Sequence, residues 1–214
     1  MFKRTTMVVG PFQCNCQILM CPESKDAVVI DPGDEGPAIA ARLQADGANV
    51  KYILHTHAHL DHCSGTHNVS QVAPHALVGL HQDDEWLYKN VPMQGQMFGM
   101  RLTAPPPVTL YFEHEMLLPF ANTQIKILHI PGHSPGSVAF SLSENTLSSV
   151  PEVFTGDTLF YRSVGRTDLW MADGSLMTKS IKQKLFTLDD ETLVHPGHGP
   201  STKIADEKRE NPFL

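Results

Sequence analysis

The sequence predicts an α/β protein with mixed β-sheets, and three observations carry this prediction. Short apolar and β-branched runs of strand length recur along the chain, and most of them end in Gly, Pro, Asp or His. Segments with apolar residues at helical spacing lie between these runs, as in α/β architectures. The first runs follow one another closely, as the strands of a hairpin do, which favours mixed over purely parallel sheets.

The expected elements follow from these patterns. Strands are expected at residues 7–9, 17–20, 27–30, 52–54, 125–130, 138–142, 153–155 and 192–194. Helices are expected at residues 37–45, 64–72, 82–89 and 176–186, with a short exposed helix at 202–209. The first helix begins with a proline and is followed by Gly47, which are helix start and stop signals. Residues 91–107 are rich in Met and Pro and predict a long irregular loop, either a functional lid or a simple surface excursion.

Length and composition predict a single globular domain over residues 1–214. The hydrophobic content of 41% is enough for a sizeable core. The formal net charge is −7 and no block of Lys or Arg occurs, so a nucleic-acid partner is not expected. The chain has no apolar run of membrane-spanning or signal-peptide length, so we expect a cytoplasmic protein with no membrane partner. The four cysteines are expected to be buried free thiols.

The stretch LHTHAHLDHCSG at residues 54–65 is the densest group of potential metal ligands. Alternation in an extended chain would place His55, His57 and His59 on one side. Asp61 and His62 follow at the point where the chain turns toward a helix. Crowded imidazoles repel one another when protonated and lack acceptors when they are buried and neutral, whereas a bound cation removes both costs.

Other strand ends carry the same residue types. Pro-Gly turns place His133 and His198 after apolar runs, Asp157 follows VFTG, and Asp31 follows VVI. Each signal is weak alone, because a Pro-Gly-His turn is more often structural and an Asp after Gly is usually a turn or helix cap. Since sites in α/β architectures form where strands end, the combination predicts a metal site.

These residues resemble the signature of the metallo-β-lactamase fold superfamily, His-x-His-x-Asp-His, over nearly the whole chain. The resemblance implies an αββα sandwich of two mixed β-sheets flanked by helices. It implies two divalent metal ions, with zinc the first choice and iron or manganese the alternatives. The implied ligands are His57, His59 and His133 for one ion, Asp61, His62 and His198 for the second, and Asp157 as the bridge. His55 and Cys63 are not expected to be ligands.

Within the superfamily the chain looks most like the short bacterial type of glyoxalase II, the hydroxyacylglutathione hydrolases. The stretches that carry this likeness are THAHLDH, GRTDL at 165–169, and the ending GHGPSTKIADEKRENPFL. The likeness implies cleavage of a small-molecule thioester of the S-lactoylglutathione type by a metal-bridging hydroxide, with Asp61 and Asp157 as catalytic residues. Full-length glyoxalase II binds the glutathione carboxylates through a helical C-terminal domain, whereas only 16 residues follow His198 here. The substitutes for that domain are Arg166 or the tail residues Lys203, Lys208 and Arg209, unless the tail charges form a solvated helix face.

Several alternatives remain at this point. A persulfide dioxygenase shares the fold and motif and would hold one iron through His57, His133 and Asp157, although its ending near the last histidine differs from PGHGP. Lactonases and β-lactamases are further hydrolase alternatives. A non-catalytic metal-binding protein of the same fold is disfavoured, because degenerate members usually lose ligands and this chain keeps all seven.

Overall fold

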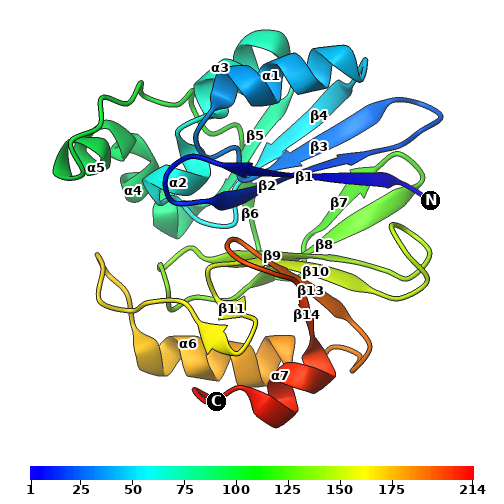
Figure 1. The fold of residues 1–214 in the computed structure, drawn as a ribbon, viewed down its shortest axis with the longest axis vertical. Coiled ribbons are helices and arrows are strands. Elements are labelled where there is room, and N and C mark those ends of the chain that lie inside the picture. Colours follow the sequence, from blue (N-terminus) through cyan, green and yellow to red (C-terminus); the bar gives the residue numbers. More distant parts are fainter. The chain divides into compact units, whose positions relative to one another are not determined.

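The computed structural model describes all 214 residues and forms two compact units. The N-terminal unit is Phe2–Phe112, and the C-terminal unit is Glu113–Leu214 together with Met1. Each unit contains one six-stranded mixed sheet and its own helices (Figure 1). The prediction of two mixed sheets flanked by helices is therefore confirmed. The single domain over residues 1–214 stays a prediction.

The N-terminal sheet begins as a hairpin and continues with parallel strands. Its strands, in spatial order, are β1 (Lys3–Val9), β2 (Cys14–Met20), β3 (Asp26–Ile30), β4 (Asn49–Leu54), β5 (Leu77–His81) and β6 (Leu110–Phe112). The pairs β1–β2 and β2–β3 are antiparallel, and β3 to β6 are parallel to one another. The carboxyl ends of β3, β4 and β5 therefore meet at one edge of the sheet, where side chains from separate segments converge.

The helices of this unit follow its parallel strands. They are α1 (Gly36–Ala45), α2 (Leu60–Cys63), α3 (Thr66–Val72), the 3₁₀ turn η1 (Gln82–Asp84), α4 (Glu85–Lys89) and α5 (Val91–Met97). In Figure 1, α1 and α3 lie together over one face of the N-terminal sheet. Ile39 and Leu43 of α1 are fully buried, four residues apart on one helical face, and this burial holds α1 on the sheet.

The C-terminal sheet is antiparallel except for one central pair. Its spatial order is β14 (Thr202–Lys203), β13 (Leu193–Pro196), β10 (Glu152–Gly156), β9 (Val138–Leu142), β8 (Thr123–His129) and β7 (Leu117–Phe120). The short hairpin β11 (Leu159–Phe160) and β12 (Ser163–Val164) follows β10, and β10 pairs with β13 in parallel. The helix α6 (Gly174–Ser180), the π-helical turn η2 (Ile181–Leu185) and α7 (Ile204–Glu210) complete the unit. Ile181, Leu185 and Ile204 from these helices are fully buried in a cluster with sheet residues such as Val153 and Val194.

Three sequence predictions were wrong in detail. The helix expected at 64–72 is preceded by a separate turn, α2, which begins at Leu60 inside the histidine-rich stretch. Residues 91–97 form α5 rather than irregular loop, because Pro92 stands at the first turn, where a missing N–H costs nothing. The tail is not merely an exposed helix, since Ile204 and Glu207 of α7 are fully buried. The strands β5, β6, β7, β11, β12 and β14 were also missed. None of the helices combines the length and apolar content that a membrane-spanning helix needs.

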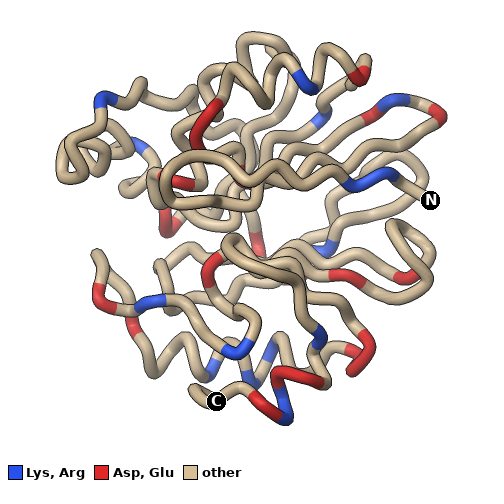
Figure 2. The backbone as a smooth tube through the Cα atoms, viewed as in Figure 1, with Lys and Arg blue, Asp and Glu red and all other residues tan.

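Acidic and basic side chains are interspersed along the backbone, including on α7 (Figure 2). The cationic residues considered for binding glutathione all have acidic partners within the C-terminal unit. These pairs are Lys203–Glu191 at 2.8 Å, Lys208–Asp190 at 2.5 Å, Arg209–Asp206 at 2.9 Å and Arg166–Asp168 at 2.6 Å. The charges of the tail therefore belong to a salt-bridged, solvated surface.

A buried carboxylate attaches α7 to the rest of the C-terminal unit. Glu207 is 0% exposed and accepts hydrogen bonds from Thr202 Oγ1 at 2.6 Å, Arg162 Nη1 and N at 3.0 Å each, and Asn211 Nδ2 at 2.8 Å. Four donors compensate the loss of hydration that a buried carboxylate suffers. We infer that this residue determines where the C-terminal helix docks.

Replacing this carboxylate should destabilise the protein strongly. Glu207→Ala removes four hydrogen bonds and one partner of a buried ion pair, and we expect it to lower the free energy of unfolding by about 3–5 kcal/mol. Urea denaturation followed by tryptophan fluorescence measures the change. The matched control is Glu210→Ala, three residues on, whose carboxylate is 44% exposed and whose ion pair should contribute about 1 kcal/mol or less. Equal losses in the two variants would contradict this account of α7.

Candidate metal centre

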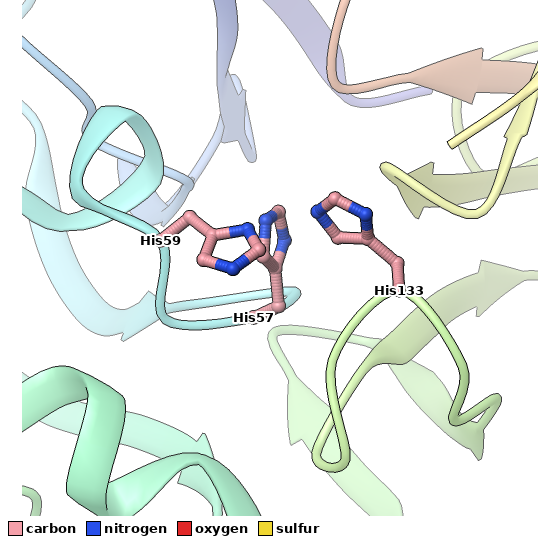
Figure 3. Close-up of side chains that lie close together, drawn as sticks. All are labelled: His57, His59 and His133. Atoms are coloured by element: carbon pink, nitrogen blue, oxygen red, sulfur yellow. The ribbon is translucent and has the colours of Figure 1, made fainter. Parts of the chain in front are cut away.

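Four of the predicted ligands lie on one short segment of the N-terminal unit. This segment runs from the end of β4 through α2, and it begins at the carboxyl end of a central parallel strand. Figure 3 shows the rings of His57 and His59 projecting from it, with ring centroids 4.8 Å apart. His62 stands in α2 with its ring centroid 4.1 Å from that of His57, and its Nε2 lies 3.7 Å from Asp61 Oδ2. The local motif therefore brings together the ligands that the sequence predicted for this unit.

A hydrogen-bond relay fixes the tautomers of two of these histidines. Asp31 Oδ2 lies 3.0 Å from His62 Nδ1 and accepts the Thr56 hydroxyl at 2.6 Å. Because the Thr56 hydroxyl donates to Asp31, its oxygen is left to accept from His57 Nδ1 at 3.1 Å. A carboxylate and a hydroxyl that already donates can only accept, so both imidazoles carry their proton on Nδ1. Both Nε2 atoms then present lone pairs, the form that binds a metal.

The remaining histidine and cysteine of the stretch are not ligands, as expected. His55 is fully buried, with Nδ1 3.0 Å from Gly79 O and Nε2 2.8 Å from Thr66 Oγ1, so both of its ring nitrogens are engaged. Burial lowers the pKa of His55 to about 4, which keeps this ring neutral. Cys63 donates to His57 O at 3.5 Å, and burial raises its pKa well above the usual range. All four cysteines are buried free thiols, which confirms the prediction.

The C-terminal unit carries a second ligand cluster at three strand ends. His133 follows β8, Asp157 follows β10 and His198 follows β13. His133, also drawn in Figure 3, lies with Nδ1 2.8 Å from the carbonyl oxygen of Arg166, so this nitrogen donates and Nε2 carries the lone pair. Asp157 Oδ2 lies 3.6 Å from His133 Nε2 and 3.5 Å from His198 Nε2. One carboxylate oxygen thus stands between two imidazole nitrogens.

The donor set of each unit fits divalent metal ions. A lone pair on His133 Nε2 that faces a carboxylate oxygen is repulsive unless a metal ion or a proton lies between them. A tetrahedral ion about 2.0–2.1 Å from a nitrogen and an oxygen ligand holds those atoms roughly 3.4 Å apart. The separations of 3.5 Å and 3.6 Å at Asp157 match this spacing, and 3.7 Å between Asp61 and His62 is close to it. Imidazole and carboxylate ligands suit zinc, iron and manganese alike.

The family model of the metallo-beta-lactamase superfamily matches residues 9–198. The chain belongs to this superfamily. The hydroxyacylglutathione hydrolase GloC of Haemophilus influenzae is 36% identical over 207 residues, which cover 96% of this chain and 95% of the relative. The structure of TTHA1623 in a di-iron-bound form has a TM-score of 0.86 and 38% identity, covering 98% of this chain and 100% of that one. The B3 metallo-beta-lactamase BLEG-1 has a TM-score of 0.89 and 34% identity, covering 100% and 99%.

Membership in the metallo-beta-lactamase superfamily, a superfamily of metallo-hydrolases, confirms the family and the fold that the motif predicted. The structure also shows supporting residues that the sequence analysis missed or left without a role. Thr56 links His57 to Asp31, and the carbonyl of Arg166 holds His133. Arg166 therefore contributes to the site through its backbone, while its guanidinium pairs with Asp168.

Two glycines allow the backbones of the two aspartate ligands to pass close by. A Cβ at Gly33 would lie 1.9 Å from Asp61 O, and a Cβ at Gly165 would lie 1.7 Å from Asp157 O. Both distances are far inside van der Waals contact, so any side chain would displace the ligand segment. Gly33 follows Asp31 in DPG, and Gly165 opens GRTDL, a stretch that carries the likeness to glyoxalase II.

Metal affinity should depend on the close contact between Gly165 and the backbone of Asp157. Gly165→Ala forces the Asp157 backbone to move, and we expect metal affinity to fall at least about tenfold. Competition with a chromogenic chelator measures zinc affinity, and circular dichroism confirms that the variant is folded. Gly47→Ala is the control, because a Cβ there meets nothing within 4 Å although φ is +64°. Wild-type zinc affinity in Gly165→Ala would contradict the close approach described here.

Proposed function

We propose that this protein is a dinuclear metallo-hydrolase that cleaves a small-molecule thioester of the S-acylglutathione type, such as S-lactoylglutathione. The observation that carries the proposal is the position of Asp157 Oδ2, 3.6 Å from His133 Nε2 and 3.5 Å from His198 Nε2. A carboxylate oxygen placed between two nitrogen ligands suits a bridge between two ions. The thioester substrate is supported by the 36% identity to GloC over nearly the full length of both chains.

The proposed ligand set draws on both units. One ion would be held by His57, His59 and His133, the second by Asp61, His62 and His198, and Asp157 would bridge them. When bound, two divalent ions of this kind supply a hydroxide nucleophile at neutral pH and polarise the acyl carbonyl. Zinc is our first choice for both positions, with iron or manganese as alternatives. The cytoplasm is the proposed compartment.

The side chains of this protein contribute orientation and charge to the reaction. Asp31 holds the proton of His62 on Nδ1, and Thr56 does the same for His57, so both Nε2 atoms stay aimed as ligands. Asp61 and Asp157 act as ionised carboxylates and are the proposed catalytic residues. A thiol leaving group has a pKa of about 8.5, so it departs as a thiolate without a general acid. The proposed reaction therefore needs correctly oriented metal ligands and no general acid.

The decisive test is anaerobic release of free thiol from S-lactoylglutathione by metal-reconstituted protein. We expect turnover without oxygen, and we expect Asp157→Ala to reduce kcat/KM at least about 100-fold, because it removes a proposed metal ligand. Asp206→Ala, an exposed carboxylate on α7 of the same unit, is the control and should retain full activity. Retained activity in Asp157→Ala would overturn the mechanism.

Parallel assays identify the alternatives. Hydrolysis of a β-lactam in place of the thioester would favour the activity named for BLEG-1, which is 34% identical over essentially the whole chain. Oxygen-dependent oxidation of glutathione persulfide by the iron-loaded protein would instead indicate a persulfide dioxygenase. Metal binding without turnover in any assay would indicate a non-catalytic member of the fold.

A further inference from the structure

Two buried side chains from outside the histidine-rich motif hold its backbone in place. The N–H of Ala58 donates to Asp84 Oδ2 at 2.9 Å. The carbonyl of Ala58 accepts Gln94 Nε2 at 3.0 Å, and the N–H of Leu60 donates to Gln94 Oε1 at 3.0 Å. Gln94 of α5 therefore holds the peptide groups on both sides of His59, and Asp84 of η1 holds the peptide group between His57 and Ala58.

The side-chain amide of Gln94 can hold this backbone because it both donates and accepts hydrogen bonds. It is 1% exposed, and its Nε2 also donates to Leu87 O at 2.9 Å. Both amide hydrogens and the amide oxygen are thus used, and two carbonyl partners on Nε2 fix the orientation of the amide. Burial of a primary amide is costly unless every polar atom finds a partner, and here two of its three partners belong to the motif.

The motif backbone needs such partners because it is neither strand nor helix where the ligands stand. His59 is extended, with φ −73° and ψ 152°, immediately before α2. Buried peptide groups in such a segment must be hydrogen-bonded, and a segment without fixed partners relaxes toward other conformations. The positions of His57 and His59 depend directly on the peptide groups of Ala58.

We propose that Gln94, with Asp84, is a positioning residue for the ligand pair His57 and His59. By fixing the peptide groups of Ala58 and Leu60, it sets the affinity of this ligand pair for metal and the geometry in which it binds. This inference rests on the metal binding in the proposed function. It also assigns a role to α5, at the start of the segment expected to be an irregular loop.

The alternative is a purely structural tie between α5 and the motif, and the two roles are distinguishable. A structural tie would affect the stability of the metal-free protein but not the metal affinity of the folded molecule. A positioning role changes metal affinity and ligand geometry under native conditions, well below the unfolding transition. The test therefore compares metal binding among folded variants and does not depend on enzymatic activity.

The principal variant is Gln94→Met, which keeps the length of the side chain and removes its hydrogen bonds. Metal-free protein is titrated with Co(II), whose visible absorption reports ligand geometry, and zinc affinity is measured by chelator competition. We expect the affinity of Gln94→Met to be about 10–100-fold lower, with an altered Co(II) spectrum. Gln96→Met, an exposed position on the same helix, is the matched control and should match the wild type.

A second variant keeps the test valid if Gln94→Met fails to fold. Gln94→Glu retains an acceptor for Leu60 N but places an acceptor against the carbonyls of Ala58 and Leu87. Burial against two carbonyls keeps the new carboxyl protonated, so it donates to one of them and retains two of the three hydrogen bonds that Gln94→Met loses. We expect this variant to fold and still to bind zinc at least about tenfold more weakly. Wild-type affinity and spectrum in the folded Gln94 variants would overturn the inference.

The outcomes for the wild-type protein separate this inference from the proposed function. If wild-type protein binds no metal, both fall. If it binds metal in a Gln94-dependent way but releases no thiol from any thioester, the proposed function falls and the positioning role stands. If it hydrolyses the thioester and the Gln94 variants bind metal as the wild type does, the proposed function stands and the positioning role falls.

Discussion

The orientation of the candidate ligands in the N-terminal unit depends on one buried carboxylate. Asp31 stands at the end of β3 with φ +50°, a conformation that costs a non-glycine residue about 1–2 kcal/mol. Pairing of β3 with β4 holds it there, since Asp31 N donates to Leu54 O at 2.9 Å. From this position its carboxylate accepts the N–H and hydroxyl of Thr56 and the Nδ1 proton of His62. Sheet pairing thus maintains a strained residue whose side chain orients two ligands, as expected where strain serves a site.

The C-terminal unit achieves the same orientation with a weaker acceptor. His133 donates its Nδ1 proton to a backbone carbonyl, that of Arg166, rather than to a carboxylate. A carboxylate increases the basicity of the imidazole that donates to it more than a neutral carbonyl does. His62, bonded directly to Asp31, should therefore be a stronger donor than His133. The candidate ligands of the two units are therefore oriented by different means, a charged relay in the N-terminal unit and a backbone carbonyl in the C-terminal unit.

The ligand residues can be identified from the sequence because their signal is local. Alternating histidines at a strand end and Pro-Gly-His turns have a physical meaning wherever the strands finally lie, and so the sequence alone points to His57, His133 and Asp157. The residues that support them cannot be identified in this way. Gln94 lies 34 residues from its partner Leu60, and no local pattern marks a glutamine whose hydrogen bonds go to a distant loop. The same limit explains the missed strands, since β5 and β6 are short and are defined by pairing rather than by alternation.

Charge at the proposed centre bears on the kind of substrate that it can attract. Asp61, Asp157 and Asp31 carry three negative charges, whereas two divalent ions would carry four positive ones, and the histidine ligands are neutral. One positive charge would then be left, and the hydroxide nucleophile of the proposed mechanism would neutralise it, in a chain whose formal net charge is −7. The cationic side chains of the tail are already paired with acids. A carboxylate-bearing thioester would therefore meet little unpaired positive charge either at the proposed centre or on the tail.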